Sequence, residues 1–536
     1  MINTLNDVPK SRTGLPVADL AATYGITVDS AHIDDWDKFL QSIDESARKV
    51  SEMDDYLPTL DVDKYPRSKG KIPEDTSTGW ALQLVAKCRV PKSDKLLDRT
   101  VALKDNIGLA GVPCTNGSAA IPDWIPQFDA TVATRIMDAG AIITGKSGQL
   151  ESGAYTCENG CYESTSETAI SGIVDNPWAK GYSAGGSSSG SASLVASGEV
   201  DMSLGCDQGG SIRMPASFCG IVGLKPTWGL VPYTGIIGLD ASIDHVGPMC
   251  KNVHDCALLL DCIAGADGVD DRQQNSVVYG RTQYLNNFET SLTGTNRDRT
   301  LEGIRIGILS EGFGQPFSDP NVDNCVRQAA RQFEMLGAHV ETCSIPSHET
   351  GQMIWGLATF MGSFQQAATG NVTGRKLVYA TDRVTRTSCD QSLFDAGGPG
   401  VRSMLLSGMH LYDSYGPGLY ARCKNLLRKL NDEYDGSLKR YDVLITPTTP
   451  HAAPRHHPPQ TGPAERLAKA LPITFNTSTL DATGHPAISI PVGFVPAQDD
   501  NSIRLPVGMQ IIGPHYGEDK LFRVAGSWER HFDWKI

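Results

Sequence analysis

The chain has 536 residues, but it lacks long apolar runs and carries few positive charges for its length. No stretch of 18 consecutive apolar residues occurs, which predicts that the protein has no transmembrane helix. Lys and Arg number 47 against 61 Asp and Glu, giving a formal charge of −14. Proteins that bind nucleic acid need a basic face, so this balance argues against a nucleic-acid partner. The 40% of hydrophobic residues still indicates a folded chain rather than a disordered one.

The N-terminus also lacks the features of a secretory signal. Residues 1–7 have neither the basic segment nor the apolar segment that such a signal requires. The 13 cysteines are scattered without a disulfide-like framework, which is typical of reduced thiols in the cytoplasm. Cys157 and Cys161 form a C-x3-C pattern, but no second pair of ligands accompanies them. We therefore expect a cytoplasmic protein without a metal site.

Residues 1–75 are interpreted as a helical extension that precedes the main body, residues 76–536. Apolar residues recur there at spacings of three and four, and so share one face of a helix: Ile33, Trp36, Leu40, Ile43, Ala47 and Val50. Such a seam either docks onto the body of the same chain or forms a subunit interface. The polar segment from Pro58 to Gly79 is interpreted as a linker.

The main body alternates short apolar segments with helical periodicities. The expected strands lie at residues 100–103, 141–145, 200–204, 304–309, 338–341, 441–445 and 487–492. Helices are expected at 130–139 and along the apolar positions from Val322 to Leu336. This alternation predicts an α/β protein with a central sheet.

Glycine is abundant, with 55 residues or about 10% of the chain against about 7% in an average protein. The excess gathers in two serine-bearing clusters, residues 181–191 and 205–215. The apolar segments 194–196 and 202–204 lie between them, which argues against a flexible linker. The Gly-x4-Gly-Lys-[Ser/Thr] pattern of a phosphate-binding loop is absent from both clusters. The glycines are therefore expected to bend the backbone close to a ligand.

Two serines in these clusters are candidate nucleophiles. Residues 186–190 match the G-x-S-x-G elbow, but the turn-like sequence at 175–180 does not provide the strand that this motif requires. Ser211 follows the apolar segment 200–204 and two glycines, and Pro215 suits the first turn of a following helix. Ser211 is therefore the better candidate, in a turn whose N–H groups can bind an oxyanion.

A serine nucleophile needs a base, and the sequence offers two kinds. His245 follows Asp244 and His485 precedes Pro486, and either could be the base, although a single histidine is more often structural. Lys104 ends an apolar strand beside a loop rich in Gly and Pro, where a buried lysine can be held as a proton-accepting amine. The residues alone leave these alternatives open.

The ordered motifs of the main body resemble those of the amidase signature family. The resemblance is carried by Gly185-Gly186-Ser187-Ser188, by Asp207-Gln208-Gly209-Gly210-Ser211-Ile212-Arg213, and by residues 101–106, 215–220, 222–227, 244–249, 442–450 and 485–491. It spans about residues 76–536 and implies the amidase signature fold, a central mixed β-sheet flanked by helices. Two positions depart from the usual pattern, because Ser189 replaces a glycine and Cys206-Asp207-Gln208 stands where Thr-Asp-Thr is common.

The resemblance implies a Ser–cis-Ser–Lys triad that needs no cofactor. Lys104 would be the lysine, Ser187 the middle serine with a cis peptide bond, and Ser211 the nucleophile. The oxyanion hole would be the backbone of Gln208, Gly209, Gly210 and Ser211. The Asp-Gln-Gly-Gly form is similar to that of nitrile-hydratase-associated amidases, whose helical N-terminal extension serves in dimerisation. A homodimer through the N-terminal helices is therefore expected.

The expected reaction is hydrolysis of a carboxylic acid amide to an acid and an amine or ammonia. The alternatives are a carbamate hydrolase (urethanase), the A-type subunit of a glutamyl-tRNA amidotransferase, and a catalytically silent binding homologue. Tyr155, Trp355 and Phe360 are candidates for the pocket wall, although aromatic residues more often belong to the core. The acyl group and the amine of the substrate are not encoded in any of these motifs.

Overall fold

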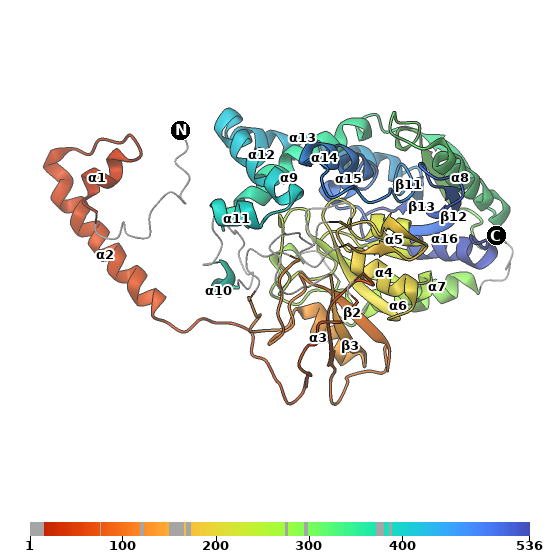
Figure 1. The fold of residues 1–536 in the computed structure, drawn as a ribbon, viewed down its shortest axis with the longest axis horizontal. Coiled ribbons are helices and arrows are strands. Elements are labelled where there is room, and N and C mark those ends of the chain that lie inside the picture. Colours follow the sequence, from red (N-terminus) through yellow and green to blue (C-terminus); the bar gives the residue numbers. More distant parts are fainter. Residues whose placement is uncertain are drawn as a thin grey trace.

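The computed structural model describes residues 15–75, 77–117, 123–148, 166–167, 173–273, 277–293, 299–370, 380–384 and 389–536. Figure 1 shows a large body from which the N-terminal helices extend to one side. Three residues singled out in the sequence, Tyr155, Cys157 and Cys161, lie outside the described residues.

One mixed sheet of 11 strands organises the body, in the order β1-β3-β2-β6-β8-β7-β12-β13-β11-β9-β10. The strands are β1 (Trp80–Ala86), β2 (Thr100–Lys104), β3 (Ile142–Ser147), β6 (Met202–Asp207), β7 (Val222–Lys225), β8 (His245–Cys250), β9 (Arg305–Leu309), β10 (His339–Cys343), β11 (Val443–Pro447), β12 (Ala487–Pro496) and β13 (Arg504–Ile512). The pairs β2–β3, β2–β6, β9–β10 and β9–β11 are parallel, and the other neighbours are antiparallel. A separate two-stranded sheet joins β4 (Asp175–Asn176) to β5 (Ala179–Ser183).

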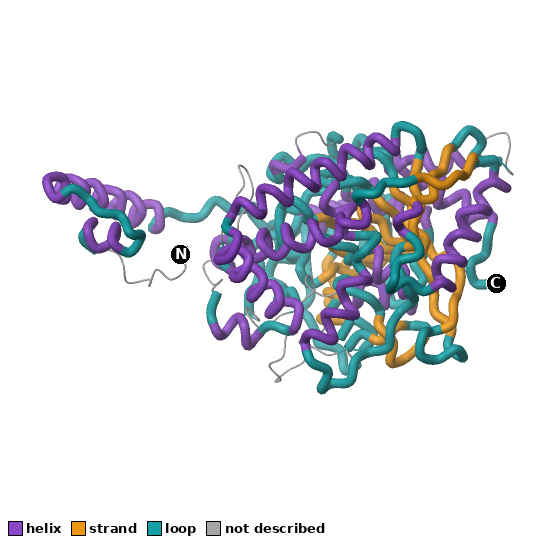
Figure 2. Tube along the Cα trace, turned by 90° about the horizontal axis from the view of Figure 1, so that it is seen from above, coloured by secondary structure: helices purple, strands orange, loops and turns teal. Residues whose placement is uncertain are grey.

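Helices surround this sheet, and Figure 2 shows the strands running through the middle of the body. The helices of the body are α3 (Thr131–Asp138), α4 (Ser189–Ser197), α5 (Arg213–Cys219), α6 (Val253–Ile263), α7 (Tyr284–Leu292), α8 (Pro320–Gln332), α9 (His348–Ser363), α10 (Thr381–Val384), α11 (Gln391–Ala396), α12 (Pro399–Tyr415), α13 (Pro417–Leu438), α14 (Pro463–Ile473), α15 (Ser478–Thr483) and α16 (Glu518–His531). Short 3-10 turns lie at Ser30–His32, Asp271–Gln273, Ser310–Gly312 and Phe333–Leu336, and α9 continues into a π-helical turn at Phe364–Ala368. In the described part of the chain, no helix is both long and apolar enough to cross a bilayer.

The strands at the centre of the sheet explain where the polar motifs meet. Every residue of β6 is buried, and β6 pairs in parallel with β2 through Val101–Met202 and Leu103–Leu204. Parallel neighbours end at the same edge of a sheet. Lys104 is the last residue of β2 and Asp207 is the last residue of β6, so both lie at the same edge of the sheet. There, Lys104 also comes within hydrogen-bonding distance of Cys206, which is 102 positions away in the sequence.

The expected elements of the α/β body are present with small shifts in their bounds. The strand expected at 200–204 begins at Met202 and runs to Asp207. The helix expected from Val322 to Leu336 is α8, which ends at Gln332, and a 3-10 turn follows at Phe333–Leu336. The interpretation of residues 175–180 as a turn without a strand was incomplete, because β5 covers Ala179–Ser183. This strand belongs to the small sheet, however, so the G-x-S-x-G segment does not follow a strand of the central sheet.

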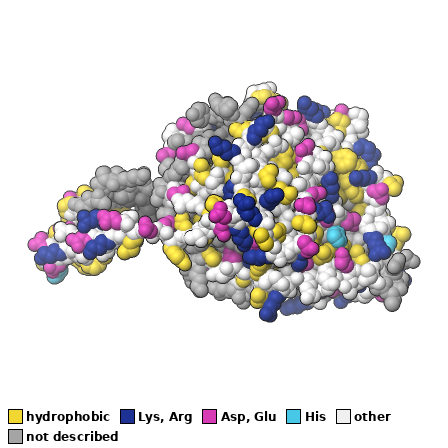
Figure 3. Space-filling model, turned by 90° about the horizontal axis from the view of Figure 1, so that it is seen from below, with side chains coloured by type: hydrophobic (Ala, Val, Ile, Leu, Met, Phe, Trp, Pro, Cys, Tyr) yellow, Lys and Arg dark blue, Asp and Glu magenta, His cyan; other side chains and the backbone are white. Residues whose placement is uncertain are grey.

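The N-terminal helices α1 (Val17–Ala22) and α2 (Ile33–Ser51) form an arm that stands away from the body in Figures 1 and 2. Neither helix contains a buried residue. Trp36, Ile43 and Val50 of the apolar seam are 51%, 48% and 64% exposed, and Figure 3 shows hydrophobic side chains among charged ones on the arm. The alternative in which the seam docks onto the body of its own chain is therefore wrong for this structure.

Candidate active site

Lys104 and Ser187 lie within hydrogen-bonding distance at the edge of the sheet. The Lys104 Nζ donates to Ser187 Oγ at 2.7 Å and to the Cys206 carbonyl at 3.4 Å. Both Lys104 and Ser187 are buried. The two residues are 83 positions apart. Lys104 ends β2, which pairs with β6, and Ser187 lies in the loop before α4, where the hydroxyl of the next residue, Ser188, donates to the Cys206 carbonyl of β6.

A second buried lysine next to this pair has a different environment. Lys146, on the neighbouring strand β3, lies 3.2 Å from Asp105 Oδ1. The other oxygen of Asp105 accepts hydrogen bonds from Thr115 N–H and Oγ1, at 3.0 and 2.6 Å. The Asp105 charge is thus paired with Lys146, whereas the hydrogen bonds of Lys104 go to a hydroxyl and a carbonyl. These neutral acceptors suit an amine that must exchange a proton with a serine.

The loop that carries Ser187 is attached directly to the loop of Ser211. The Gly186–Ser187 peptide bond is cis, as the family resemblance implies. The next residue, Ser188, donates its N–H to the Ser211 carbonyl at 3.2 Å and its hydroxyl to the Cys206 carbonyl at 3.2 Å. Ser189, which replaces the usual glycine, is the first residue of α4. The two serine-bearing clusters of the sequence therefore form one site.

The turn that holds Ser211 is fixed by a buried ion pair. Asp207 accepts hydrogen bonds from Gly210 N–H and Ile212 N–H, and its carboxylate also binds Arg213, with Nε 3.0 Å from Oδ2. Arg213 is fully buried and also donates to Asp481 Oδ2 at 2.7 Å. Burial alone would raise the pKa of Asp207, but the Arg213 charge outweighs it and holds that pKa well below its usual range. The turn is therefore held by a permanently charged carboxylate.

The N–H groups of the turn are not equally available for an oxyanion. The Gly210 N–H is already donated to Asp207 Oδ1, so the structure differs here from the expectation that Gly210 belongs to the oxyanion hole. Within the described residues, the N–H groups of Gln208, Gly209 and Ser211 have no protein acceptor. These three remain the candidate oxyanion donors.

Two glycines are required in this turn for steric reasons. A Cβ on Gly209 would lie 2.5 Å from the Trp355 ring, and one on Gly210, whose φ is +130°, would lie 2.2 Å from Thr477 Oγ1. Trp355 Nε1 donates to the Gln208 carbonyl at 2.9 Å, and Thr477 Oγ1 donates to the Gly209 carbonyl at 2.7 Å. Trp355 and Thr477 thus bind the carbonyls of Gln208 and Gly209 and fix the path of the turn.

The Gln208 side chain points into a polar cluster rather than toward a substrate. Its Nε2 donates to Tyr233 OH at 2.8 Å and to Asp244 Oδ1 at 3.1 Å. Burial raises the pKa of Asp244 to about 7, against the opposing charge of Arg272. The departure from Thr-Asp-Thr to Cys206-Asp207-Gln208 therefore gives the turn an additional anchor. Cys206 itself is buried and donates to Asn106 Oδ1 at 3.3 Å.

The structure does not place either candidate histidine base at Ser211. His245 is buried on β8, with Nδ1 2.7 Å from the Ile243 carbonyl and Nε2 3.3 Å from Lys225 Nζ. Burial and the nearby Lys225 hold the pKa of His245 well below its usual range. His485 contacts Thr483 and Asp435 instead. A histidine-based triad is therefore wrong for this arrangement, and Lys104 is the base candidate that the geometry supports.

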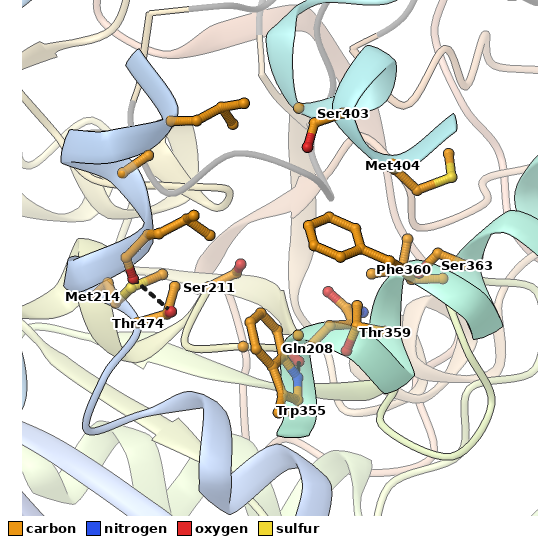
Figure 4. A pocket seen from close by; sticks show the side chains of 17 residues that line it. Gln208, Ser211, Met214, Trp355, Thr359, Phe360, Ser363, Ser403, Met404 and Thr474 are labelled. Carbon is orange, nitrogen blue, oxygen red and sulfur yellow. Dashed lines mark hydrogen bonds between the residues drawn. The ribbon is translucent and has the colours of Figure 1, made fainter. Parts of the chain in front are cut away.

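A cavity of about 110 Å³ opens beside Ser211. Its described lining is mostly apolar and comes from four helices, the turn and the segment between β7 and β8: Gln208, Gly209, Ser211, Met214, Leu239, Trp355, Gly356, Thr359, Phe360, Ser363, Gly400, Ser403, Met404, Leu467, Ala470, Leu471 and Thr474. Figure 4 shows the Ser211 hydroxyl at one side of this space, with Trp355 below it and Phe360 and Met404 across from it. An engineered apolar cavity of about 150 Å³ binds benzene, so this space suits a group of about ring size.

The cavity wall is only partly visible in the sequence. Two of the candidates, Trp355 and Phe360, line it, and both lie on α9. Thr477, which holds the turn, and the lining residues Met404 of α12 and Leu471 of α14 belong to none of the motifs recognised in the sequence. The apolar spacing of Leu467, Ala470 and Leu471 marks the inner face of α14, yet nothing in that pattern distinguishes a pocket wall from ordinary core packing.

Comparisons with known proteins agree with this geometry. A family model described as Amidase matches residues 87–522, and the chain belongs to this family. An enantioselective amidase from Rhodococcus rhodochrous is 38% identical over 80% of this chain and 79% of the relative. The A-type subunit of glutamyl-tRNA(Gln) amidotransferase from a Cyanothece species is 33% identical over 89% of this chain and 90% of the relative.

Solved structures show the same fold. The A-type subunit of glutamyl-tRNA(Gln) amidotransferase from Thermotoga maritima superimposes with a TM-score of 0.64 and 28% identity, covering 82% of this chain and 85% of the other. The peptide amidase from Stenotrophomonas maltophilia gives a TM-score of 0.61 and 26% identity, covering 82% and 83%. The expected amidase signature fold, a mixed sheet flanked by helices, is therefore confirmed.

Proposed function

We propose that this protein is an amidase that hydrolyses neutral carboxylic amides with an apolar acyl group, releasing an acid and an amine or ammonia. The observation that carries this proposal is the 2.7 Å hydrogen bond from Lys104 Nζ to Ser187 Oγ, next to the turn of Ser211. Lys104 acts as the base, Ser187 relays the proton and Ser211 is the nucleophile. No cofactor is needed, because every step is a proton transfer or an acyl transfer.

In the first half of the reaction, an acyl-enzyme forms. The Lys104 amine accepts the proton of Ser187 while Ser187 accepts the proton of Ser211, and Ser211 Oγ attacks the amide carbon. The N–H groups of Gln208, Gly209 and Ser211 are the candidate donors that stabilise the resulting oxyanion, each such donor contributing about 3 kcal/mol. The C–N bond then breaks as the proton returns through Ser187 to the leaving nitrogen.

In the second half, water hydrolyses the ester on Ser211. Water gives a proton to the Ser187–Lys104 pair, and its oxygen attacks the ester carbon. The ester C–O bond breaks, Ser211 Oγ recovers its proton and the carboxylic acid leaves. The same residues thus act once as a base and once as an acid in each half-reaction.

The cavity supports an apolar acyl group and disfavours glutamine. None of the described lining residues is charged, and Trp355, Phe360, Met404 and Leu471 provide most of the apolar wall. The carboxylate and ammonium groups of glutamine would lose water there without gaining a partner, which costs several kcal/mol. This favours the amidase over the A-type subunit of a glutamyl-tRNA amidotransferase, despite the similarity to such subunits.

The function is tested by hydrolysis of a small substrate panel. Benzamide and long-chain amides should be cleaved faster than acetamide, and glutamine should be a poor substrate. Ethyl carbamate distinguishes the urethanase alternative, because a preference for it over the amides would contradict the proposed substrate class. Rapid release of ammonia from glutamine would favour the amidotransferase alternative.

Phe360→Ala should reduce the discrimination between aromatic and small amides. The variant removes a ring from the wall opposite Ser211 and leaves the triad untouched. Loss of a well-packed apolar contact costs about 1–3 kcal/mol, so kcat/KM for benzamide should fall by roughly 10- to 100-fold. For acetamide it should change by less than about threefold. Equal losses for both substrates would show that Phe360 does not contact the acyl group.

We also propose that the protein is a cytoplasmic homodimer held together by its N-terminal helices. All 11 cysteines of the described residues are free thiols, which suits a reducing compartment. Trp36, Ile43 and Val50 form an exposed apolar stripe on α2, and a second copy of the same helix is a natural partner for such a stripe.

Ile43→Glu should convert this dimer into a monomer. A charge in the centre of the apolar stripe would be buried without a partner in the dimer. Light scattering after size-exclusion chromatography should give one chain mass for the variant and two for the parent. Lys38→Glu, a change at another exposed position of the same helix, is the matched control and should remain dimeric. A parent protein that is monomeric at micromolar concentration would contradict the proposal.

A further inference from the structure

Three possible metal ligands from distant parts of the chain lie close together beside the C-terminal end of α15. Asp435 lies on α13, His485 follows α15, and His515 lies between β13 and α16. One ligand atom from each side chain lies within 4.8 Å of the other two. We propose that Asp435, His485 and His515 bind one divalent transition-metal ion of the zinc type. This site is separate from Lys104, Ser187 and Ser211 and does not depend on their proposed roles.

The distances between these side chains suit a small tetrahedral ion. His485 Nε2 lies 3.2 Å from Asp435 Oδ1. Zinc bonds to nitrogen and oxygen of about 2.0–2.2 Å place neighbouring ligand atoms of a tetrahedron roughly 3.3–3.5 Å apart. One edge of the coordination polyhedron is therefore already formed. The His515 ring is partly exposed and stacks on His485 with centroids 4.1 Å apart, and its ligand atom lies within 4.8 Å of those of Asp435 and His485.

Neighbouring polar groups hold the ligands in place. Asn431 Nδ2 donates to Asp435 Oδ2 at 3.1 Å, and Asn431 Oδ1 lies 3.1 Å from His515 Nε2. Thr483 Oγ1 lies 3.0 Å from His485 Nδ1. Hydrogen bonds of this kind orient metal ligands and raise the affinity for the ion. Asn431 therefore links two of the three ligands, and Thr483 fixes the third.

Solvent access also suits a metal ion. The Asp435 side chain is 40% exposed, which leaves room for water at the fourth position.

Zinc binding at this site should stabilise α15 and the segment around it. His485 follows α15 closely, and Asp481 within α15 binds the buried Arg213. An ion that binds only the folded state raises stability by mass action. We therefore expect the thermal midpoint of the EDTA-treated full-length protein to rise by several degrees when zinc is added in excess.

The experiment titrates zinc sulfate into the EDTA-treated protein by calorimetry and compares four chains. The parent should bind one zinc per chain at this site, and His515→Ala and Asp435→Asn should each weaken binding by at least about 10-fold. His410→Ala removes an exposed histidine outside the cluster and should bind like the parent. Cobalt is the spectroscopic probe, because nitrogen and oxygen ligands give visible absorption without a thiolate charge-transfer band.

Three results would overturn the proposal. The first is zinc binding by His515→Ala and Asp435→Asn with the affinity of the parent. The second is the absence of zinc binding by the parent, and the third is a thiolate charge-transfer band in the cobalt protein, which would assign the ion to cysteines. Thermal melting without zinc checks that the variants fold. If His515→Ala does not fold, Asp435→Asn, which keeps the shape of the side chain, tests the proposal alone.

Discussion

Ser211→Ala is expected to lose at least about 10⁴-fold in kcat for benzamide hydrolysis, because the variant has no oxygen to form the acyl-enzyme. The hydroxyl lines the cavity and has no hydrogen-bond partner among the described residues, so its removal should leave the thermal midpoint almost unchanged. The turn itself is held by Asp207, Trp355 and Thr477, none of which contacts the Ser211 hydroxyl.

Activity and covalent labelling measure this prediction together. A serine-directed fluorophosphonate should label the parent at Ser211 and should not label the variant. Ser189→Ala is the matched control, because Ser189 is the first residue of α4, at a position where the family usually has glycine, and the variant should retain normal turnover. A fully active Ser211→Ala would refute the assignment, and a parent that neither labels nor turns over would favour the catalytically silent homologue.

Lys104→Met is expected to reduce kcat/KM by about 10²–10⁴-fold at neutral pH, the usual contribution of a positioned base. The variant keeps the length and apolar stem of the lysine but removes the amine that binds Ser187 Oγ at 2.7 Å. Hydroxide can replace a missing base, so the deficit should shrink as the pH rises. A pH profile of kcat/KM for both proteins, with thermal midpoints to confirm folding, measures the effect.

The chain offers a matched control for this lysine. Lys424 Nζ also donates to a serine hydroxyl, that of Ser242, at 2.8 Å, but it lies on α13 outside the proposed triad. Lys424→Met should therefore keep activity close to that of the parent. If Lys104→Met retained more than about a tenth of the activity at neutral pH, the base would have to be another group, and the relay through Ser187 would be wrong.

The sequence predicted the α/β body because its strands and helices have clear periodicities. The strands at 100–103 and 304–309 were recovered within one residue as β2 and β9. The apolar seam of α2 could also be predicted from the sequence, but the surface that it contacts could not. The same spacing occurs in a helix that packs on the body of its own chain and in a helix at a subunit interface. The fold leaves Trp36 and Ile43 exposed and so removes the first alternative.

The residues of the candidate site could be predicted from the sequence, but their hydrogen-bond partners could not. Lys104, Ser187 and Ser211 belong to motifs whose order is recognisable along the chain, and the structure places them at one edge of the sheet. The Gly210 N–H was expected to be free, whereas Asp207 accepts it. Hydrogen-bond partners of this kind depend on the path of a single turn, which no residue pattern specifies.

The sequence by itself determined the residue types, the local periodicities and the glycines that allow the two loops to bend. Only the tertiary structure decided which of these groups meet, because the contacts join positions far apart in the chain: Lys104 with Ser187, Arg213 with Asp481, and Asp435 with His485 and His515. The absence of a metal site was predicted from the lack of closely spaced ligands. Strand pairing and helix packing bring together ligands that have no such spacing, and so the proposed zinc site could be recognised only in the folded chain.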